Sequence, residues 1–239
     1  MTDYRLRNSR RNQSFFGSMS LTNIIIYINV AVFIIVSLLI GFGIGGNVEG
    51  GDAGIFRYVA LNPELFLGGF IWTLITSMFM HAGFGHLLVN MVSMFFIGNL
   101  IEKIIGRKRL FWFYLVAGIV AGLAFVGLAY LGTFVQGGER LFGGTDAFAV
   151  GASGALFGLG GLLAVLIPRL RVLVFFVIPM PMWIAMIVLM FGLWVLSAVG
   201  NLPIGNTAHF GGLIVGVAYG FYLRNKYSRK VKMLNRMFA

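Results

Sequence analysis

Residues 147–167 read AFAVGASGALFGLGGLLAVLI and end directly before Pro168 and Arg169. These 21 residues include no Asp, Glu, Lys or Arg. A stretch of about 20 apolar residues is long enough to cross a hydrocarbon core roughly 30 Å thick. We therefore predict a membrane-spanning helix here, with the hydroxyl of Ser153 at membrane depth.

The whole chain is too apolar for a soluble protein. Of its 239 residues, 59% are hydrophobic and only 10% are charged, and the mean hydropathy is +0.93. Soluble domains carry about 25% charged residues. The composition excludes a soluble globular enzyme, a disordered chain and an ordinary nucleic-acid binder. The absence of cysteine from the sequence excludes a disulfide framework, a Cys-ligated metal site and a thiol nucleophile.

Six apolar stretches reach the length of a membrane span. They cover residues 22–42, 84–101, 110–131, 147–167, 172–199 and 206–223. In the fifth stretch, Pro179 and Pro181 predict either a kink or the start of an interfacial piece. We predict an all-α membrane protein, a six-transmembrane-helix bundle without strands, with Gly-rich loops at 43–71 and 132–146.

The distribution of positive charge predicts the orientation of this bundle. Sixteen of the 18 Lys and Arg residues fall in four groups, at 5–11, 103–109, 169–171 and 224–236. With six spans, all four groups lie on one side of the membrane, and Lys and Arg are enriched on the cytoplasmic side. Both termini are therefore predicted to be cytoplasmic. The net charge of +11 then reflects topology and contact with lipid rather than nucleic-acid binding.

The chain divides into three parts on this prediction. Residues 1–20 form a basic cytoplasmic N-terminal segment, for which an organelle transit peptide is an alternative. Residues 21–224 form the six-span core, with an outer loop at 43–71. Residues 225–239 form a basic cytoplasmic tail that either binds anionic lipid or only fixes the topology. We expect a multi-pass protein of a prokaryotic cell membrane.

Polar side chains on three spans fall at one depth. Counted at about 1.5 Å per helical residue from the basic side, Ser153, His209, His86 and Asn90 all lie roughly 20–25 Å deep. This level is in the outer third of the bilayer. The chain has three histidines, His81, His86 and His209, and all of them lie in or beside the second or the sixth span. Ionisable groups at membrane depth are candidate functional residues. The alternative is that such a histidine only forms a hydrogen bond between packed helices.

Small residues predict which of these spans pack together. Gly154 and Gly158 are four residues apart in the fourth span, and the sixth span carries glycines at the same spacing from Gly212 onward. Such stripes let helix backbones approach closely. Packing these two spans would bring Ser153 and His209 together in the geometry of an activated serine. A purely structural serine is the alternative.

Three motifs together resemble one known family. They are G-A-S-G at 151–154, A-H-F-G-G-x3-G-x3-G at 208–220, and H-x4-H-x3-N at 81–90. This set is similar to that of the rhomboid family of intramembrane serine proteases. The resemblance covers the six-span core, from about residue 20 to residue 224. It implies a rhomboid-like bundle with its active site towards the outer face.

The resemblance also implies roles for individual residues. Ser153 matches the nucleophile and His209 matches its general base. The side chains of His86 and Asn90, with the Ser153 backbone N–H, match the oxyanion hole. His81 matches the first histidine of the second-span motif.

Other positions of the motifs are expected to support the site. Gly151, Gly154 and Gly212 allow close packing around it. Phe157 stands where the family often has a tyrosine that stacks on the catalytic histidine, so the ring can pack but provides no hydroxyl. Because Asp146 falls in an outer loop, we predict a Ser–His dyad without a third, acidic member.

The function expected from these residues is hydrolysis of peptide bonds in or near transmembrane segments of other membrane proteins. A helical substrate protects its own peptide bonds, so local unwinding and a movable element are needed. The fifth span and the Gly-rich loop before the sixth are the candidates for that element. No metal or cofactor is expected, and the sequence leaves the oligomeric state open.

Three other classes of protein fit the sequence less well. A membrane metalloprotease would carry a motif such as H-E-x-x-H, whereas the histidines of the second span are five apart with no Glu between them. A transporter would show repeated halves and an intramembrane carboxylate. A non-catalytic rhomboid-like protein that binds transmembrane clients is the main alternative, and the intact Ser153 and His209 argue against it.

Overall fold

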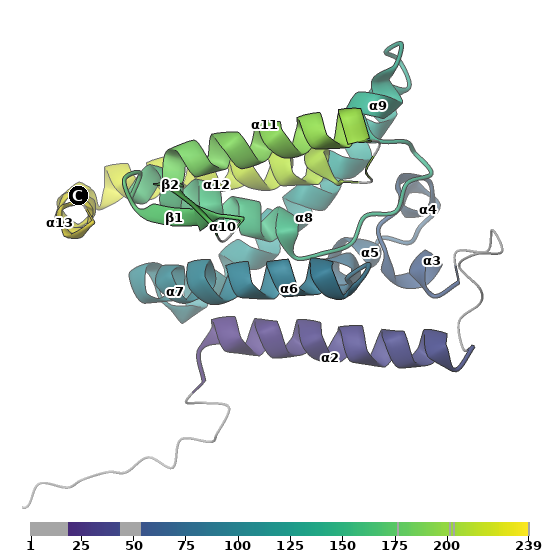
Figure 1. Cartoon of the computed structure of the whole chain (residues 1–239), viewed down its shortest axis with the longest axis horizontal. Helices are drawn as coiled ribbons and strands as arrows, with labels where there is room; N and C mark the ends of the chain where they lie inside the picture. The colour runs from purple at the N-terminus through teal and green to yellow at the C-terminus, as the bar shows by residue number, and fades with distance from the viewer. Residues whose placement is uncertain (1–18, 44–53, 176, 201, 203, 239) are drawn as a thin grey trace, which may run out of the picture.

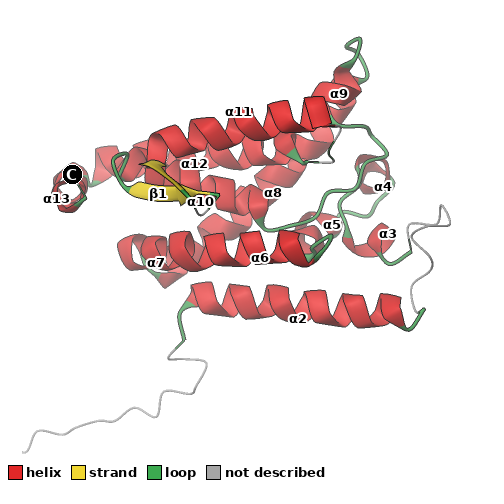
Figure 2. Cartoon of the chain, in the orientation of Figure 1, coloured by secondary structure: helices red, strands yellow, loops and turns green. Residues whose placement is uncertain are grey.

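The computed structural model describes residues 19–43, 54–175, 177–200, 202 and 204–238. Most of the basic N-terminal segment and residues 44–53 of the outer loop lie outside the described residues. Figure 1 shows the chain and Figure 2 its secondary structure. The elements are α2 (Leu21–Gly41), α3 (Phe56–Val59), α4 (Pro63–Leu67), α5 (Thr73–Thr76), η2 (Ser77–Phe79), α6 (Phe84–Ser93), η3 (Met94–Gly98), α7 (Asn99–Ile105), α8 (Arg107–Gly132), α9 (Gly138–Phe142), α10 (Ser153–Leu166), β1 (Arg171–Val174), β2 (Ile178–Pro181), α11 (Met182–Gly200), α12 (Asn206–Lys226) and α13 (Ser228–Met237).

Long helices lie side by side along the horizontal direction of Figure 1. Among the described residues, four helices are long and apolar enough to cross a membrane: α2, the continuous segment Phe84–Ile105, α8 and α11. A fifth helix, α12, has 21 residues but is more polar, because it carries His209 and cations at its end. The bundle and the apolar helices agree with the sequence prediction, while the count of six spans stays a prediction.

The helix that carries Ser153 is shorter than the sequence predicts. α10 has 14 residues and begins at Ser153, so the apolar residues 147–152 are not helical. Ala149 instead pairs with Leu61 in an isolated β-bridge. Twelve of the 14 residues of α10 are buried, which places this helix inside the bundle. A helix shielded by protein on all sides does not need the full length of a lipid-exposed span.

The prediction of a fifth span from 172 to 199, and of a chain without strands, is wrong in its first ten residues. β1 and β2 form an antiparallel hairpin, in register from Arg171 opposite Pro181 to Val174 opposite Ile178. The helix α11 starts only after the hairpin. The physical reason is local. β-branched and aromatic residues favour strands, and proline is disfavoured inside a helix but tolerated on an edge strand.

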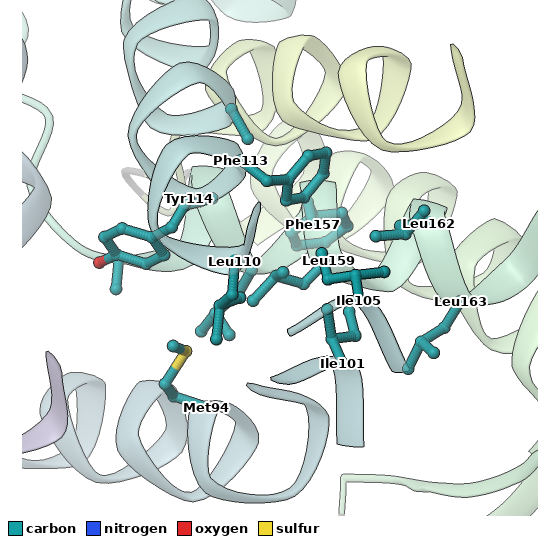
Figure 3. Close-up of a cluster of buried hydrophobic side chains, with 14 of the residues drawn as sticks. Met94, Ile101, Ile105, Leu110, Phe113, Tyr114, Phe157, Leu159, Leu162 and Leu163 are labelled. Atoms are coloured by element: carbon teal, nitrogen blue, oxygen red, sulfur yellow. The ribbon is translucent and has the colours of Figure 1, made fainter. Parts of the chain in front are cut away.

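The core of the bundle is formed by side chains from α6–α7, α8 and α10. Figure 3 shows Met94, Leu110, Leu159 and Leu163 packed together in this cluster. All four side chains are almost completely inaccessible to solvent. Their packing fixes α10 against the neighbouring helices and therefore fixes the position of its first residue, Ser153.

One carboxylate ties the first helix to the second span. Glu102 Oε1 accepts a hydrogen bond from the Leu21 N–H at 2.8 Å, and its Oε2 accepts from the Thr22 N–H at 2.9 Å. The Thr22 hydroxyl also donates to Oε2. These are the N–H groups that a helix leaves without partners at its start. Glu102 thereby caps α2 across 80 residues of chain.

Candidate active site

Ser153 and His209 meet at one end of two adjacent helices. Ser153 is the first residue of α10, and His209 is the fourth residue of α12. The distance from Ser153 Oγ to His209 Nε2 is 2.8 Å, which is a hydrogen-bonding distance. The contact expected from the packing of these spans is therefore present.

His209 is almost fully enclosed, and its imidazole has a single hydrogen-bond partner among the described residues. Its side chain is 7% exposed, and its Nδ1 has no partner within the described chain. Asp146 is exposed, and its backbone carbonyl accepts a hydrogen bond from Asn62 Nδ2. Among the described residues, the arrangement is a Ser–His pair in which no carboxylate contacts His209 Nδ1, and the dyad stays a prediction.

Glycines bring the two helices close enough for this contact. A Cβ added at Gly212 would overlap the carbonyl of Gly154, and one at Gly216 would overlap the carbonyl of Gly158. The backbones of α10 and α12 are thus in direct contact. On another side of α10, a Cβ at Gly154 would lie 2.6 Å from the Ala121 Cβ of α8. The predicted close packing of the two glycine stripes is confirmed.

The ring of Phe157 stacks on the imidazole of His209. The ring centroids are 4.3 Å apart and the planes differ by 12°. Phe157 lies one helical turn after Ser153, so the same helix that presents the hydroxyl also supports its partner. The stacking holds the imidazole plane in place without a hydrogen bond from the aromatic side chain.

His86 and Gly151 complete the surroundings of the hydroxyl. Gly151 has a φ of +119°, which disfavours L side chains, and its N–H donates to the Ser77 carbonyl at 2.8 Å. A Cβ at Gly151 would lie 2.9 Å from His86 Nε2 and 3.7 Å from Ser153 Oγ. The glycine therefore leaves free the space between the His86 ring and the serine hydroxyl.

Asn90 lies one turn after His86 and is 3% exposed. Its Nδ2 donates to the His86 carbonyl at 2.8 Å, and its Oδ1 has no partner among the described residues. An amide nitrogen carries two hydrogens, so one N–H of Asn90 is left for another acceptor.

His81 lies beside His86 rather than beside Ser153. The His81 and His86 ring centroids are 5.1 Å apart in an edge-on arrangement. His81 is 4% exposed and lines a cavity of about 320 Å³ between α2 and the start of α6. His81 therefore contacts a residue of the candidate site, His86, and not the Ser153–His209 pair itself.

The start of α10 contributes backbone donors. Its N-cap residue, Ala152, has no side chain able to cap a helix, so the first N–H groups of the helix have no side-chain partner. These groups carry partial positive charge at a helix N-terminus. They lie next to Ser153 Oγ, where negative charge would develop on an acyl group attacked by the serine.

Sequence analysis missed the contacts that hold the segment before Ser153. Leu61 and Ala149 exchange backbone hydrogen bonds of 3.0 and 2.7 Å. Asn62 Nδ2 donates to the Asp146 carbonyl at 2.7 Å, and the Thr145 hydroxyl donates to Glu64 Oε1 at 2.7 Å. The sequence Asn62–Pro63–Glu64 is a recognisable helix start, which could have located α4 but not its partner loop.

Within the described part of the chain, no group of three or more His, Asp or Glu side chains is placed to hold a metal ion. The side chains that meet at the site supply a hydroxyl, an imidazole and hydrogen-bond donors.

Comparison with known proteins agrees with the motifs. The family model of the Rhomboid domain matches residues 68–226. The chain belongs to the rhomboid family.

RHOMBOID-like protein 5 of Arabidopsis thaliana is 37% identical over 166 residues, covering 69% of this chain and 48% of the relative. Rhomboid protein 1, mitochondrial, of Saccharomyces cerevisiae is 30% identical over 175 residues, covering 70% and 47%. A Bacillus subtilis relative, YdcA, is 40% identical over 90 residues, covering 38% of each.

The chain spans less than half the length of these curated relatives. Family membership and the apolar helices identify an integral membrane protein of the rhomboid family. The relatives come from a plant, yeast mitochondria and a bacterium, so they do not single out a prokaryotic membrane, and that expectation is not supported.

Proposed function

We propose that this rhomboid-family chain is an intramembrane serine endopeptidase that cleaves transmembrane segments of other membrane proteins. The observation that carries the proposal is the 2.8 Å contact between Ser153 Oγ and His209 Nε2. A nucleophile within hydrogen-bond reach of an imidazole is the basic requirement of nucleophilic catalysis by serine.

Acylation follows from this pair. His209 Nε2 takes the proton of Ser153 as Oγ bonds to the carbonyl carbon of the scissile peptide. When the tetrahedral intermediate collapses, the C–N bond breaks and Nε2 gives the proton to the leaving amine. Water then attacks the acyl-enzyme with His209 again acting as base, which releases the second product and restores the Ser153 hydroxyl.

We propose that the oxyanion of the intermediate is bound by three donors. They are the Ser153 backbone N–H, the Asn90 amide and a ring N–H of His86. The open start of α10 and the free N–H of Asn90 support this assignment. Removing one such donor typically lowers the rate by about 10²- to 10³-fold.

The proposed topology has six spans with both ends on the basic, cytoplasmic side. It is supported by the placement of the described cations. The ends of α7 and α12, the start of α8 and the hairpin lie at one end of the bundle, whereas α4 and α9 lie at the other (Figure 1). The Arg107 guanidinium also donates to the Met19 carbonyl at 2.9 Å, which joins the start of α2 to that end.

The experiment compares cleavage of a generic single-span substrate by the purified full chain with cleavage by Ser153→Ala and His209→Ala. We expect both variants to lose activity by about 10⁴-fold or more and to lose labelling by a fluorophosphonate probe. Ser93→Ala, a half-buried serine of α6, is the matched control and should cleave normally.

The outcomes separate protease from client-binding protein. Labelling without cleavage would mean that the serine is active and the substrate is wrong. A folded wild type that neither labels nor cleaves would overturn the proposal in favour of a non-catalytic protein that binds transmembrane clients, and Phe157 would be the first residue to revisit.

A further inference from the structure

Three cations from three helices surround one tyrosine at the basic end of the bundle. Arg109 Cζ of α8 lies 5.8 Å from the centroid of the Tyr227 ring. Lys226 Nζ, the last residue of α12, lies 5.9 Å away, and Lys230 Nζ of α13 lies 6.0 Å away. We call these four residues the Tyr227 cluster. Each cation is attracted to the face of the Tyr227 ring, but three like charges around one ring repel each other.

No described carboxylate side chain balances this charge. Both oxygens of Glu102, the one described acid near this end, accept hydrogen bonds from the start of α2. The other described acids, Glu64, Glu139 and Asp146, belong to α4, α9 and the loop before α10, at the opposite end of the bundle (Figure 1). The cluster therefore lacks an anion among the described side chains.

Aromatic residues place this cluster at the level of lipid headgroups. Tyr219 and Tyr222 of α12 stack with centroids 6.0 Å apart, and the Tyr222 hydroxyl accepts a hydrogen bond from Lys226 Nζ at 2.8 Å. Tyrosine is enriched where a membrane protein crosses the interface between hydrocarbon and water. Phe221 and Tyr222 are 49% and 52% exposed, so they face the lipid beside the cluster.

The last helix lies across the bundle. Figure 1 shows α13 end-on, whereas α12 runs across the view, so α13 is steeply inclined to the spans. Val231 of α13 is buried in the core cluster, and Asn235 Nδ2 donates to the Leu166 carbonyl at the end of α10 at 2.7 Å. One face of α13 is thus fixed to the base of the bundle.

The two flanks of α13 differ in character. At about 100° per residue, Met233 and Met237 share the flank of Lys230, and they are 65% and 72% exposed. The opposite flank carries Lys232 and Arg236, both exposed, and Arg229 lies between the two flanks. A helix with an apolar flank and a basic flank is the kind that lies in the plane of a membrane interface.

We propose that the Tyr227 cluster binds the headgroup phosphate of an anionic phospholipid, with the methionine flank of α13 set against the acyl chains. The phosphate supplies the counter-charge that the described side chains do not provide. The lipid then joins α8, α12 and α13 at the basic end of the bundle. An anionic lipid surface attracts basic segments of membrane proteins, and here three helices converge on one position.

The test of the site uses the full chain in detergent, titrated with dioleoylphosphatidylglycerol, dioleoylphosphatidylcholine or inorganic phosphate. Native mass spectrometry counts bound lipid, and thermal unfolding reports stabilisation. We expect the chain to prefer dioleoylphosphatidylglycerol over dioleoylphosphatidylcholine. The double variant K226Q/K230Q should lower the apparent affinity for dioleoylphosphatidylglycerol about 10- to 30-fold. The control K232Q/R236Q removes the same number of charges from the opposite flank of α13. It should change the apparent affinity for dioleoylphosphatidylglycerol less than about 3-fold.

Several results would overturn the lipid site. Equal losses in the two double variants would show general charge attraction. Equal binding of both lipids, or equal stabilisation by inorganic phosphate, would exclude a specific lipid headgroup. A second copy of the chain bound in place of lipid would show a protein interface instead.

A second measurement tests the orientation of α13 and does not depend on the charge variants. Because the sequence has no cysteine, Met233→Cys and Lys232→Cys each provide a single labelling site. In vesicles containing 30 mol% dioleoylphosphatidylglycerol, an environment-sensitive dye at 233 should be quenched by spin-labelled lipid, and one at 232 should not. Equal quenching at both positions would overturn the assignment of the flanks.

Discussion

α10 and α11 both contact α12, but they pack against it in opposite ways. α10 is buried along almost its whole length and touches α12 backbone to backbone, whereas α11 buries four of its 19 residues. These four, Met182, Ala185, Met186 and Met190, all lie in the first half of α11. The outer half of α11, next to the active site, contains no buried residue.

In the outer half of α11, Leu193 and Trp194 are only partly buried against the core, and Trp194 also makes polar and aromatic contacts with neighbouring helices. Trp194 Nε1 donates to the Leu141 carbonyl in α9 at 2.8 Å, and its ring meets the Phe210 ring of α12 edge-on, with centroids 6.2 Å apart. Helix pairs with extensive burial resist displacement, and segments with few buried contacts open at low free energy. The comparison supports a rigidly held Ser153–His209 pair and makes α11 our candidate for the movable element that the proposed function requires.

The largest effect is expected from breaking the rigid pair. Gly212→Ala places a Cβ against the Gly154 carbonyl and forces α10 and α12 apart. A misplacement of about 1 Å can lower the rate about 10²-fold, and overpacking destabilises by about 1–3 kcal/mol. Cleavage assays and thermal unfolding measure the two effects.

Gly192→Ala in α11 is the matched control, because a Cβ there has nothing within 4 Å. It should keep full activity and unfold at the same temperature or slightly higher, since alanine favours a helix by about 1 kcal/mol over glycine. Equal losses in both variants would contradict the proposed difference between the two helices.

A smaller effect is expected from fixing the mobile element. In the double variant Trp194→Cys with Phe210→Cys, a short cleavable thiol crosslinker would join α11 to α12. If α11 must move to admit a helical substrate, crosslinking should lower cleavage about 10-fold or more. Labelling of Ser153 by a small fluorophosphonate should be unchanged.

The same variant without crosslinker, and the crosslinked protein after linker cleavage, are the controls. Full cleavage of the transmembrane substrate by the crosslinked protein would show that α11 does not need to move relative to α12.

The smallest effect is expected from loosening α11. Trp194→Phe removes the hydrogen bond to Leu141 but keeps a ring against Phe210. A hydrogen bond of this kind contributes about 0.5–1.5 kcal/mol, so the outer half should open more readily and cleavage should rise about 2- to 5-fold. Trp183→Phe, at the other end of α11, is the control and should leave the rate unchanged. A fall in the rate of cleavage for Trp194→Phe would show that Trp194 supports catalysis rather than closure.

The sequence was most informative where function depends on short motifs and glycine spacing. The glycines of α10 and α12 predicted the helix contact, and the positions of Ser153 and His209 at the heads of the two stripes then predicted their meeting. Such predictions succeed because close backbone contact requires glycine and a helix fixes the spacing of its side chains.

The sequence was less informative where a segment is apolar but not helical. Residues 172–181 are as apolar as a span, and only Pro179 and Pro181 indicated otherwise. Residues 147–152 leave the helix because Leu61 and Asn62 hold them, and a contact between residues more than 80 positions apart leaves no local pattern. Likewise, the sequence shows that residues 225–239 are basic, whereas the packing of α13 beneath the bundle depends on contacts of Val231 and Asn235 with other helices.

The contact of Gly212 with the Gly154 carbonyl has a consequence for how such a chain can diversify. The separation of the α10 and α12 backbones beneath the hydroxyl and the imidazole is set by contact between main-chain atoms, which a substitution on the outer faces does not touch. The exposed faces of α2 and α11 can therefore change in length and composition to suit bilayers of different thickness, while Ser153 Oγ and His209 Nε2 keep their spacing. Adaptation to a new membrane and preservation of the chemistry become separable in the evolution of this fold.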